Sequence, residues 1–584
     1  MAMLRITRLR TLALLTLTVL VLASAATAGQ TRLYAKGVRV CKPAVKANQA
    51  TCLAMKRVFV KAGTPGAVTF HPAVMSAARP GVATIGPKGG LTPGDLWAAY
   101  QVTTGATAGS GQTVAIVDAY NDPKIAASLA TFSTHYGLSS CTTGNGCLKI
   151  VNQSGAASPL PANDTTGWSV EETLDVEAVH AICQGCKIVL VEANNGNLST
   201  LGAAENAAAN TIHATEISNS FGGTENSNST LAAEFNHPGI VITASSGDNG
   251  YYSWDNLTNG GTNRPWMPAA FPTVVSVGGT GLYLNQGGIR QNELAWNDDG
   301  PQAAYELAIG APLGASGSGC SHFFTAPGWQ THVPNWSATG CGTKRLDNDV
   351  SALADPLTGF DIYDSYTCAS GCPKTATWTT VGGTSLAAPI VAAIFALAGG
   401  AQGVPYPALT LYGHMSSAYD VTVGGSGYCD GEGAPQCTAG GTNPNLLGFG
   451  VVDCAWSSSG AAQPDTRACD AAPGYDGPSG VGAPNGMTMF TKTGPNFTIS
   501  GAATATQNVS QSWSAASISD PFPGGSVSTS TGCSWAWGDG SHSLNTTCTP
   551  TAHTYTSTGT KTITLTVTDS YGITTAKTLM VTVS

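Results

Sequence analysis

Residues 381–399 read VGGTSLAAPIVAAIFALAG, and this stretch guides the interpretation of the whole chain. Two glycines and a threonine lead into Ser385, and the apolar run that follows predicts a buried helix to about Ala398. Pro389 is tolerated because it lies near the first turn. Ser385 is a candidate nucleophile, since the field and the backbone N–H groups at a helix N-terminus can hold an oxyanion. The alternative is an ordinary N-cap serine.

Short apolar strands alternate with helical stretches on the N-terminal side of this helix. Residues 169–182 and 200–211 have helical patterns. This rhythm predicts an α/β domain with a mainly parallel sheet, whose ligand sites lie at the C-terminal ends of the strands. The expected strands are TVAIVDAY (113–120), KIVLVEA (187–193), ATEISNSFGG (214–223), GIVITASSGD (239–248) and TVVSVGGT (273–280).

Two carboxylates share one face of the helix predicted for WSVEETLDVEAVHAI (168–182). Glu171 and Asp175 are four residues apart, and Leu174 and Ala178 mark the side of this amphipathic helix that packs. Neighbouring carboxylates repel unless they share a proton, which raises one apparent pKa. The alternative is a solvated acidic face near a helix N-terminus.

A third acid follows a strand in ITASSGDNG (242–250). Ser245, Ser246 and Gly247 turn the chain and present Asp248 at the strand's C-terminal end, where active-site groups of such sheets lie. Taken alone, Asp-Asn-Gly is simply a turn. None of the ten histidines precedes Gly-Thr, so the histidine element of a subtilisin-like site is missing.

The first 90 residues predict export and a leader. Arg5, Arg8 and Arg10 precede the apolar run 12–23, and residues 26–28 offer a small-residue cleavage site. Residues 1–28 are therefore expected to be a signal peptide, with an uncleaved membrane anchor as the alternative, and the mature protein is expected to be secreted. Residues 29–90 predict a short prosegment or leader module that ends in a Gly/Pro-rich linker.

Composition narrows the class of protein. Only 10% of the 584 residues are charged, whereas hydrophobic residues at 42% suffice to build a core. The net charge is −9, and no basic run occurs after the first ten residues. We expect no nucleic-acid partner and, after signal cleavage, no membrane partner.

The 16 cysteines fall into eight pairs of sequence neighbours, as expected for disulfides in an oxidising compartment. Cys183 and Cys186 could instead form a redox or zinc half-site, but no second CxxC completes a metal site. The expected pairs are 41/52, 141/147, 183/186, 320/341, 368/372, 429/437, 454/469 and 533/548.

The order of the motifs resembles the sedolisin family of serine-carboxyl peptidases, which has a subtilisin-like fold. Glu171 and Asp175 stand in ExxLD, Asp248 in ASSGDNG and Ser385 in GGTSLAAP. The resemblance covers most of residues 91–490. Further matching stretches are LTPGDLWAAY (91–100), SNSFGG (218–223), GSGCSHFFTAPGWQ (317–330) and DVSALADPLTGFDIYD (349–364).

The resemblance implies a role for each residue. Ser385 attacks the peptide carbonyl, Glu171 is the general base and acid, and Asp175 orients Glu171. Asp248 stabilises the oxyanion and must be protonated to donate a hydrogen bond. Asp118 looks like the position of a further acid linked to the catalytic glutamate, and in a subtilisin it would be read as the triad aspartate. Glu172 is the less favoured base, because its side chain lies about 100° round the helix from that of Glu171.

The resemblance also implies one structural Ca²⁺, bound by the carboxylates of Asp420 and Asp476 and the carbonyls of Val421, Ala472 and Gly474. An all-oxygen set suits this hard cation. Ala472 stands where the family pattern has Gly, and residues 422–470 form an insertion between the two halves of the site. The alternative is a pair of ordinary loop aspartates.

The chain departs from the family at its N-terminal end and gains a module at its C-terminal end. Only about 60 residues separate the signal from Leu91, where sedolisins usually carry a large prodomain. Residues 491–584 predict a linker and a β-sandwich that resembles a PKD domain through WAWGDG (535–540), HTY (553–555) and TITLTVTDSYG (562–572). The sequence leaves two roles for this module: it could contact polysaccharide or fibrous protein, or it could act only as a spacer.

Together these features predict a secreted, monomeric endopeptidase that cleaves protein or peptide substrates at acidic pH. One alternative is a subtilisin-like Ser/His/Asp protease that uses Asp118 and Ser385. The other is a non-catalytic binding or adhesion protein that keeps the peptidase fold as a scaffold.

Overall fold

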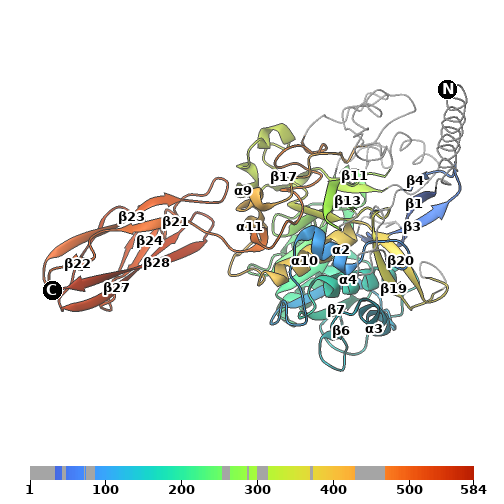
Figure 1. Ribbon diagram of the computed structural model, residues 1–584, viewed down its shortest axis with the longest axis horizontal. Coiled ribbons are helices and arrows are strands. Elements are labelled where there is room, and N and C mark those ends of the chain that lie inside the picture. The colour runs from blue at the N-terminus through green and yellow to red at the C-terminus, as the bar shows by residue number, and fades with distance from the viewer. Residues whose placement is uncertain are drawn as a thin grey trace, which may run out of the picture.

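The chain forms an α/β body and an elongated β module that projects from it (Figure 1). A computed structural model describes residues 33–42, 48–70, 73, 86–252, 264–285, 288–298, 314–368, 373–427 and 467–584. The predicted signal peptide, residues 1–28, lies outside the described residues. Within the described part of the chain, no helix has the length and apolar character needed to cross a membrane.

A central sheet of eight strands organises the body. Its order is β14-β13-β10-β8-β5-β7-β6, with β18 beside β13, and every pairing except that of β13 with β14 is parallel. The predicted mainly parallel sheet is confirmed. The strands are β5 (Thr113–Ala119), β6 (Leu148–Asn152), β7 (Lys187–Ala193), β8 (Glu216–Asn219), β10 (Val241–Ser245), β13 (Val275–Leu284), β14 (Arg290–Ala295) and β18 (Val350–Leu353).

Each face of this sheet builds its own core, because successive side chains of a strand point to opposite sides. On β5, Val114 and Ile116 face one cluster, whereas Ala115 and Val117 face the other. The first face packs against α4 (Trp168–Ile182) and α10 (Thr384–Leu397), and α3 (Ile125–Tyr136) packs on α4 in the same cluster. The second packs against α5 (Leu198–Asn210) and α6 (Ser229–Glu234).

Helix α4 differs from the sequence prediction. The pattern indicated an amphipathic helix with a solvated side, but every residue of α4 is buried. The helix lies between α10, α3, α2 (Pro93–Tyr100) and the central sheet, so no side of it faces water. Its acidic residues are therefore inside the protein, which is unusual for carboxylates without a charged partner.

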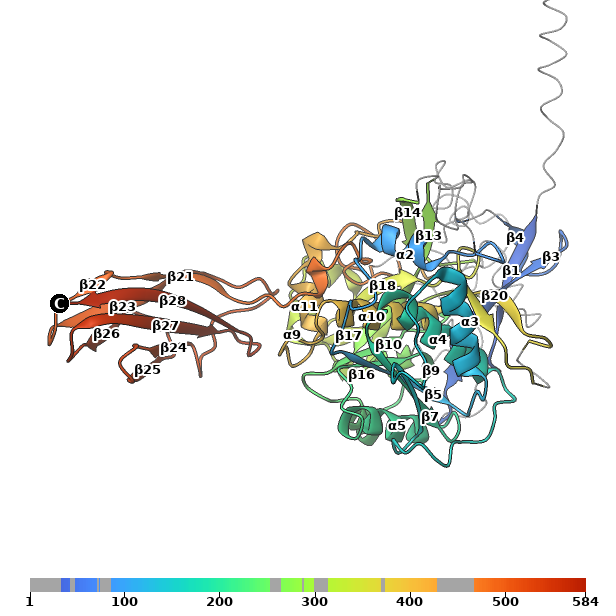
Figure 2. The same cartoon turned by 60° about the horizontal axis from the view of Figure 1, so that its bottom comes forward.

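A second, antiparallel sheet joins the N-terminal leader to the body. Its order is β19-β20-β3-β1-β4, and Figures 1 and 2 both place the leader strands beside β20. The leader contributes β1 (Tyr34–Arg39), β3 (Met55–Val60) and β4 (Val68–Thr69), and the body contributes β19 (Phe360–Asp364) and β20 (Thr377–Gly382). The leader strands thus extend a sheet of the body instead of forming a unit of their own.

A further leader strand pairs elsewhere on the body. Strand β2 (Thr51–Cys52) is antiparallel to β9 (Phe221–Thr224), which also pairs with β12 (Trp266–Met267). The remaining elements of the body are short. They are β11 (Asn249–Tyr251), β15 (Ala315–Ser318), β16 (Cys320–Thr325), β17 (Lys344–Leu346), α9 (Gly328–Thr331), α11 (Ala408–Tyr412), η3 (Trp336–Thr339), η4 (Met415–Ser417) and η5 (Thr488–Phe490).

The C-terminal module is a two-sheet β-sandwich, as predicted. Its sheets have the orders β21-β23-β26 and β22-β28-β27-β24-β25, and Trp513, Trp535 and Trp537 are buried in its core. The two layers are visible in the turned view (Figure 2). The strands are β21 (Asn496–Ser500), β22 (Thr504–Ala505), β23 (Ser510–Ser519), β24 (Cys533–Ala536), β25 (His542–Asn545), β26 (Thr551–Thr554), β27 (Gly559–Thr568) and β28 (Thr574–Val583).

The structure confirms the predicted disulfides that lie wholly within the described residues. Five of the expected pairs form: 41–52, 141–147, 183–186, 320–341 and 533–548. The bond between Cys183 and Cys186 replaces the redox or zinc half-site interpretation. Cys368 and Cys469 are also disulfide-bonded, and their expected partners, 372 and 454, lie outside the described residues together with the pair 429/437.

Candidate active site

Ser385 lies at the start of α10, directly after β20. The N-cap of α10 is Gly383, at φ +94°, so Ser385 occupies the first turn and is not the N-cap serine of the alternative interpretation. The Ser385 hydroxyl is buried and donates a hydrogen bond to the carbonyl oxygen of Ser220, at 3.2 Å. The Ser220 hydroxyl donates in return to the Ser385 carbonyl, also at 3.2 Å. This reciprocal pair fixes α10 against the end of β8.

Glu171 faces this serine from α4, which packs against α10, and Asp175, one turn later, faces the hydroxyl of Ser220. Burial and the neighbouring Asp175 raise the pKa of Glu171 well above its usual value, while the Ser385 hydroxyl acts to lower that pKa. The Glu171 carboxyl oxygens form no hydrogen bond of regular geometry, so the hydroxyl lies near the base without being fully engaged by it. Burial likewise raises the pKa of Asp175, and the Ser220 hydroxyl opposes this shift. Two coupled carboxyl groups in one dry site favour a shared proton.

Asp248 lies at the C-terminal end of β10, as the sheet rule predicts. Its Oδ1 accepts hydrogen bonds from the backbone N–H and the hydroxyl of Thr384, each at 2.8 Å. Burial nevertheless raises the pKa of Asp248 to about 7, because desolvation outweighs those two donors. A methyl group added at Gly383 would lie 2.9 Å from Asp248 Oδ2, so this oxygen borders the space in front of α10. The raised pKa favours the protonated form of Asp248, which is the form that can donate a hydrogen bond.

A second group of buried carboxyls continues behind Asp175. Burial, Asp175 and Glu171 raise the pKa of Asp118, which closes β5. Burial and then Asp122 raise the pKa of Glu192, at the end of β7, to about 9. Sequence analysis singled out Asp118 and missed Glu192, although an acid inside the apolar strand KIVLVEA was the available signal.

Glu172 belongs to this second group and not to the serine. Its Oε2 accepts the backbone N–H of Asp122 at 2.9 Å, and its pKa is raised first by burial and then by Glu192 and Asp122. This orientation matches the expectation that Glu171, one residue earlier, is the group that faces Ser385. In the described residues, no histidine forms a hydrogen bond with Ser385.

Leader residues lie across this site, which sequence analysis did not foresee. Strand β2 pairs with β9 so that Thr51 is opposite Gly222 and Cys52 is opposite Phe221. The Leu53 N–H then donates to the carbonyl of Ser220, at 3.3 Å, the same carbonyl that accepts from Ser385. The only sequence signal in this segment was the Cys41/Cys52 pair.

Asp420 and Asp476, predicted to bind Ca²⁺ from the two sides of the insertion, both accept hydrogen bonds from the loop 472–474. The buried Asp476 carboxyl accepts the Ala472 N–H at 2.8 Å, and the exposed Asp420 carboxylate accepts the Gly474 N–H at 3.0 Å. Burial raises the pKa of Asp476, and Asp420 adds to the shift, so the two carboxyls sense each other. In the described residues, no hydrogen bond uses the carbonyl oxygens of Val421, Ala472 or Gly474. The donor set therefore fits a hard cation.

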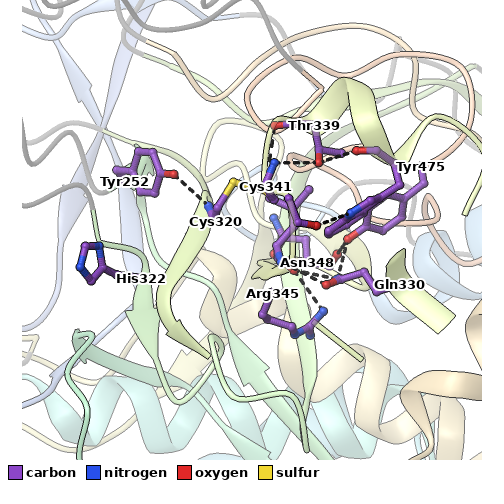
Figure 3. The surroundings of a disulfide bond; sticks show 12 residues. Tyr252, Cys320, His322, Gln330, Thr339, Cys341, Arg345, Asn348 and Tyr475 are labelled. Carbon is purple, nitrogen blue, oxygen red and sulfur yellow. Dashed lines mark hydrogen bonds between the residues drawn. A yellow bond between two sulfur atoms is a disulfide. The ribbon is translucent and has the colours of Figure 1, made fainter. Parts of the chain in front are cut away.

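The loop that precedes Asp476 is hydrogen-bonded to the residues around the Cys320–Cys341 disulfide (Figure 3). The Gln330 side chain donates to the Tyr475 hydroxyl at 2.7 Å, and Tyr475 donates to the Asn348 carbonyl at 3.2 Å. Tyr475 directly precedes Asp476 in the chain. These bonds anchor the acidic loop to the body.

Comparisons with known proteins agree with this geometry. The family model of the subtilase family matches residues 150–409, and that of the PKD domain matches residues 495–583. Kumamolisin from Bacillus sp. (strain MN-32) is 31% identical over 399 residues, 64% of this chain and 65% of that protein. Sedolisin from Pseudomonas sp. (strain 101) is 27% identical over 388 residues, 63% of this chain and 61% of that protein. The chain thus spans less than two thirds of the length of either relative.

A solved structure shows the same fold. Pseudomonas sedolisin, a serine-carboxyl proteinase complexed with two molecules of pseudo-iodotyrostatin, matches with a TM-score of 0.50 and 24% identity over 68% of this chain and 95% of that chain. The subtilisin-like body is therefore confirmed. The body of this chain is therefore similar to the curated peptidases kumamolisin and sedolisin and has the fold of sedolisin, and residues 495–583 match the PKD domain.

Proposed function

We propose that this chain is a serine-carboxyl endopeptidase that hydrolyses protein or peptide substrates at acidic pH. The single observation that carries the proposal is the meeting of Ser385 with Glu171 on one side and with the space bordered by Asp248 Oδ2 on the other. A nucleophile, a base and an oxyanion donor are the three parts that acyl transfer needs.

Each residue then has one task. Ser385 attacks the substrate carbonyl, and Glu171 accepts the hydroxyl proton and passes it to the leaving amine. Asp175 holds Glu171 in place and shares its proton, as the orienting member of a triad does. Asp248, held at Oδ1 by Thr384, donates from Oδ2 to the oxygen that becomes negative in the transition state.

The working pH follows from the protonation states that Asp248 and Glu171 need during the reaction. Asp248 must keep its proton, and its pKa is about 7, so activity falls before or near neutrality. Glu171 must be able to accept a proton, which sets the acid limb. Because Glu171 and Asp175 titrate as a pair, we expect a bell confined to roughly pH 3–6.

The test is a pH profile of kcat/KM on one peptide for wild type, Glu171→Gln and Ser385→Ala. We expect no activity from Ser385→Ala and a loss of at least about 100-fold in Glu171→Gln, the lower end for a general base. Glu172→Gln is the matched control, because Glu172 faces Asp122, and it should keep most of the activity. A wild-type optimum above about pH 7 would contradict the proposal. So would a Ser385→Ala variant that keeps the full function of the protein, because a non-catalytic binding protein would not need this hydroxyl.

The proposal also includes a bound cation, a role for the PKD-like module and secretion of the protein. The carboxylates of Asp420 and Asp476 and the carbonyls of Val421, Ala472 and Gly474 would hold one structural Ca²⁺, which would neutralise the buried acid. The PKD-like module is proposed either to contact polysaccharide or fibrous protein or to act as a spacer. Secretion is proposed from residues 1–28.

A further inference from the structure

We propose that the Ser220 hydroxyl is a positioning group of the active site, which joins the Asp175 carboxyl to the backbone of Ser385 and so sets the pH at which Glu171 becomes a base. The inference rests on the proposed peptidase function and adds to it a side chain with a task of its own. It is carried by the hydrogen bonds that meet at the end of β8.

Ser220 lies between two strands that lead to the nucleophile. It follows Asn219, the last residue of β8, and precedes Phe221, the first residue of β9. The residue is fully buried. Its carbonyl accepts the Ser385 hydroxyl and its own hydroxyl donates to the Ser385 carbonyl, each at 3.2 Å. Two bonds in opposite directions fix the distance and the orientation between Ser220 and the start of α10.

The same hydroxyl reaches Asp175. It lies near enough to that carboxyl to lower its pKa, against the effect of burial. Neither carboxyl oxygen of Asp175 has a hydrogen bond of regular geometry among the described residues. A serine hydroxyl has one proton to donate, so the Ser385 carbonyl and Asp175 compete for it. The proton turns toward Asp175 when this carboxyl is ionised, because hydrogen bonds to a charged acceptor are the stronger ones.

The charged groups nearest to Asp175 are themselves carboxyls. Glu171 lies one turn earlier on α4, and Asp118 approaches from the end of β5. Behind Asp118 lies Glu192, its partner in the register of β5 and β7. Helix α10 carries no ionisable side chain. Within the described residues no cation acts on the pKa of Asp175, so a neutral donor such as Ser220 is what favours its ionised form.

The other titratable groups on and around α4 have different neighbours. Glu172 and Glu177 each accept a backbone N–H of another segment, at 2.9 Å. Asp95 caps its own helix, α2, and His135 lies in the last turn of α3. None of these four groups shifts the pKa of Asp175. The ionisation of Asp175 is therefore governed by the dyad, by the acids behind it and by the Ser220 hydroxyl.

The ionisation of the dyad decides whether Glu171 can work. Glu171 can accept the Ser385 proton only after the pair of Glu171 and Asp175 has lost one proton. The two carboxyls share the resulting charge, so a donor to either of them makes that first proton easier to remove. By donating to Asp175, the Ser220 hydroxyl lowers the pH of the acid limb. Once Glu171 has taken the Ser385 proton, the pair is neutral and the hydroxyl returns to the Ser385 carbonyl.

A bound peptide does not need this hydroxyl. The extended leader contacts the backbone of Ser220, where the Leu53 N–H donates to the carbonyl at 3.3 Å. The Leu53 carbonyl oxygen borders the same space as Asp248 Oδ2, since a methyl group added at Gly383 would lie too close to both oxygens. In the described part of the chain, no hydrogen bond joins the leader to the Ser220 hydroxyl. Loss of the hydroxyl should therefore change kcat and leave KM nearly unchanged.

The experiment compares wild type with Ser220→Ala, each as the full chain after signal removal. Values of kcat and KM on one peptide are measured from about pH 3 to 8. We expect the acid limb of kcat/KM in Ser220→Ala to move upward by about one pH unit, as when a carboxylate loses one hydrogen bond. The alkaline limb, which is set by Asp248, should stay in place.

Two further variants separate this role from a structural one. Ser220→Thr keeps a hydroxyl at the same position and should restore the wild-type acid limb. Ser218→Ala is the matched control, because Ser218 is a buried serine on β8 whose hydroxyl has no hydrogen-bond partner among the described residues. It should leave both limbs unchanged. Melting curves verify that all three variants are folded.

A second measurement does not depend on activity. Infrared difference spectroscopy across pH follows the protonated carboxyl band that Asp175→Asn removes. In Ser220→Ala this band should persist to a higher pH than in wild type, because the ionised Asp175 has lost its donor. Ser218→Ala should titrate like wild type.

The outcomes separate this inference from the proposed function. If wild type cleaves the peptide at acidic pH but the acid limb and the infrared band of Ser220→Ala match those of wild type, the inference is wrong and the proposed function stands. A shift that Ser218→Ala reproduces, or that Ser220→Thr does not reverse, would assign the effect to packing and also overturn the inference. A folded wild type that cleaves no peptide overturns the proposed function, and the infrared band then decides whether Ser220 acts on Asp175.

Discussion

The leader and the PKD domain flank the same α/β body but attach to it by different kinds of contact. The leader enters two sheets through main-chain pairing, and Leu53 reaches the carbonyl that also binds Ser385. The PKD domain instead touches the body through side chains. Its Tyr571 packs edge-on against Trp329 of α9, with ring centroids 5.6 Å apart, and its Phe522 is buried in the cluster that belongs to the body.

This difference indicates different purposes. Main-chain pairing of an extended segment with a strand is a general way of binding peptides, and the leader is held in this way beside Ser385. A few aromatic contacts at one end of a sandwich leave the rest of the PKD domain free in solution (Figure 1). The leader contact also includes ionisable groups of the site, whereas the contact of the PKD domain is mainly apolar. Perturbations should therefore act on the two segments unequally.

The largest expected effect comes from Asp248, which borders the Leu53 carbonyl. Asp248→Ala should lower kcat by about 100-fold to 1,000-fold at acid pH, the range for loss of one oxyanion donor. Asp248→Asn should keep a donor, because its amide oxygen can still accept the two Thr384 bonds. It cannot ionise, so its alkaline limb should move upward from about pH 7. Stopped assays from pH 3 to 9 measure this, and an unchanged limb in the asparagine variant would assign the fall to another group.

The second effect separates the stability of the body from that of the PKD domain. Burial raises the pKa of Glu205 and of Glu216 in the body to about 8, whereas Asp539 of the PKD domain has a pKa lowered to about 2. A raised folded-state pKa gives stability that is complete below about pH 4 and lost as the pH rises through the folded-state value. Each unit corresponds to about 1.4 kcal/mol. Calorimetry should therefore show the body melting lower from pH 4 to 9, while the PKD domain, in which burial raises the pKa of Asp569 to about 6, should lose stability only up to about pH 6.

A single substitution sharpens this comparison. Glu205→Gln should flatten the loss of stability of the body between pH 5 and 8, because glutamine does not titrate. Glu234→Gln is the comparison variant, because burial raises the pKa of this half-buried carboxyl too but by less, and it should flatten the slope less than Glu205→Gln does. Equal slopes for wild type and Glu205→Gln would show that Glu205 is not held protonated in the folded chain.

The third effect is that of calcium, which should act on the body alone. A ligand that binds only the folded state adds about 2.7 kcal/mol at 100 times its Kd. Chelation should therefore lower the Tm of the body and leave that of the PKD domain unchanged. In Asp476→Asn the Tm should no longer respond to added Ca²⁺. If chelation shifts neither Tm, or if the variant still responds to Ca²⁺, the proposed site is wrong.

The smallest effect concerns the attachment of the PKD domain. Tyr571→Ala should weaken the contact with Trp329 by about 0.5–1.5 kcal/mol beyond the lost buried area, the range for an aromatic pair. Truncation after Thr491 should preserve cleavage of short peptides, since every proposed catalytic residue precedes it. Small-angle scattering and peptide assays test both points. Complete loss of peptide cleavage after truncation would show that the body depends on the PKD domain.

Much of this molecule could be predicted from local patterns. The parallel strands, the helix after Ser385 and five disulfides within the described residues follow from period, spacing and parity. Glu171 and Asp175 were predicted on one helix face because they are four residues apart on a single element. What could not be predicted was that α4 is buried on every side, since this depends on which elements surround it.

The sequence by itself determined which residues can do chemistry and which family they resemble, because these motifs are contiguous and each lies on one element. Only the tertiary structure brought Glu192 beside Asp118, and Leu53 beside Ser220 and Gly383. The physical reason is that pairing between distant segments is decided by competition among many possible partners, and no local period records its outcome. Burial, which raises the pKa of Asp248 to about 7, likewise exists only once the chain has folded around that carboxyl.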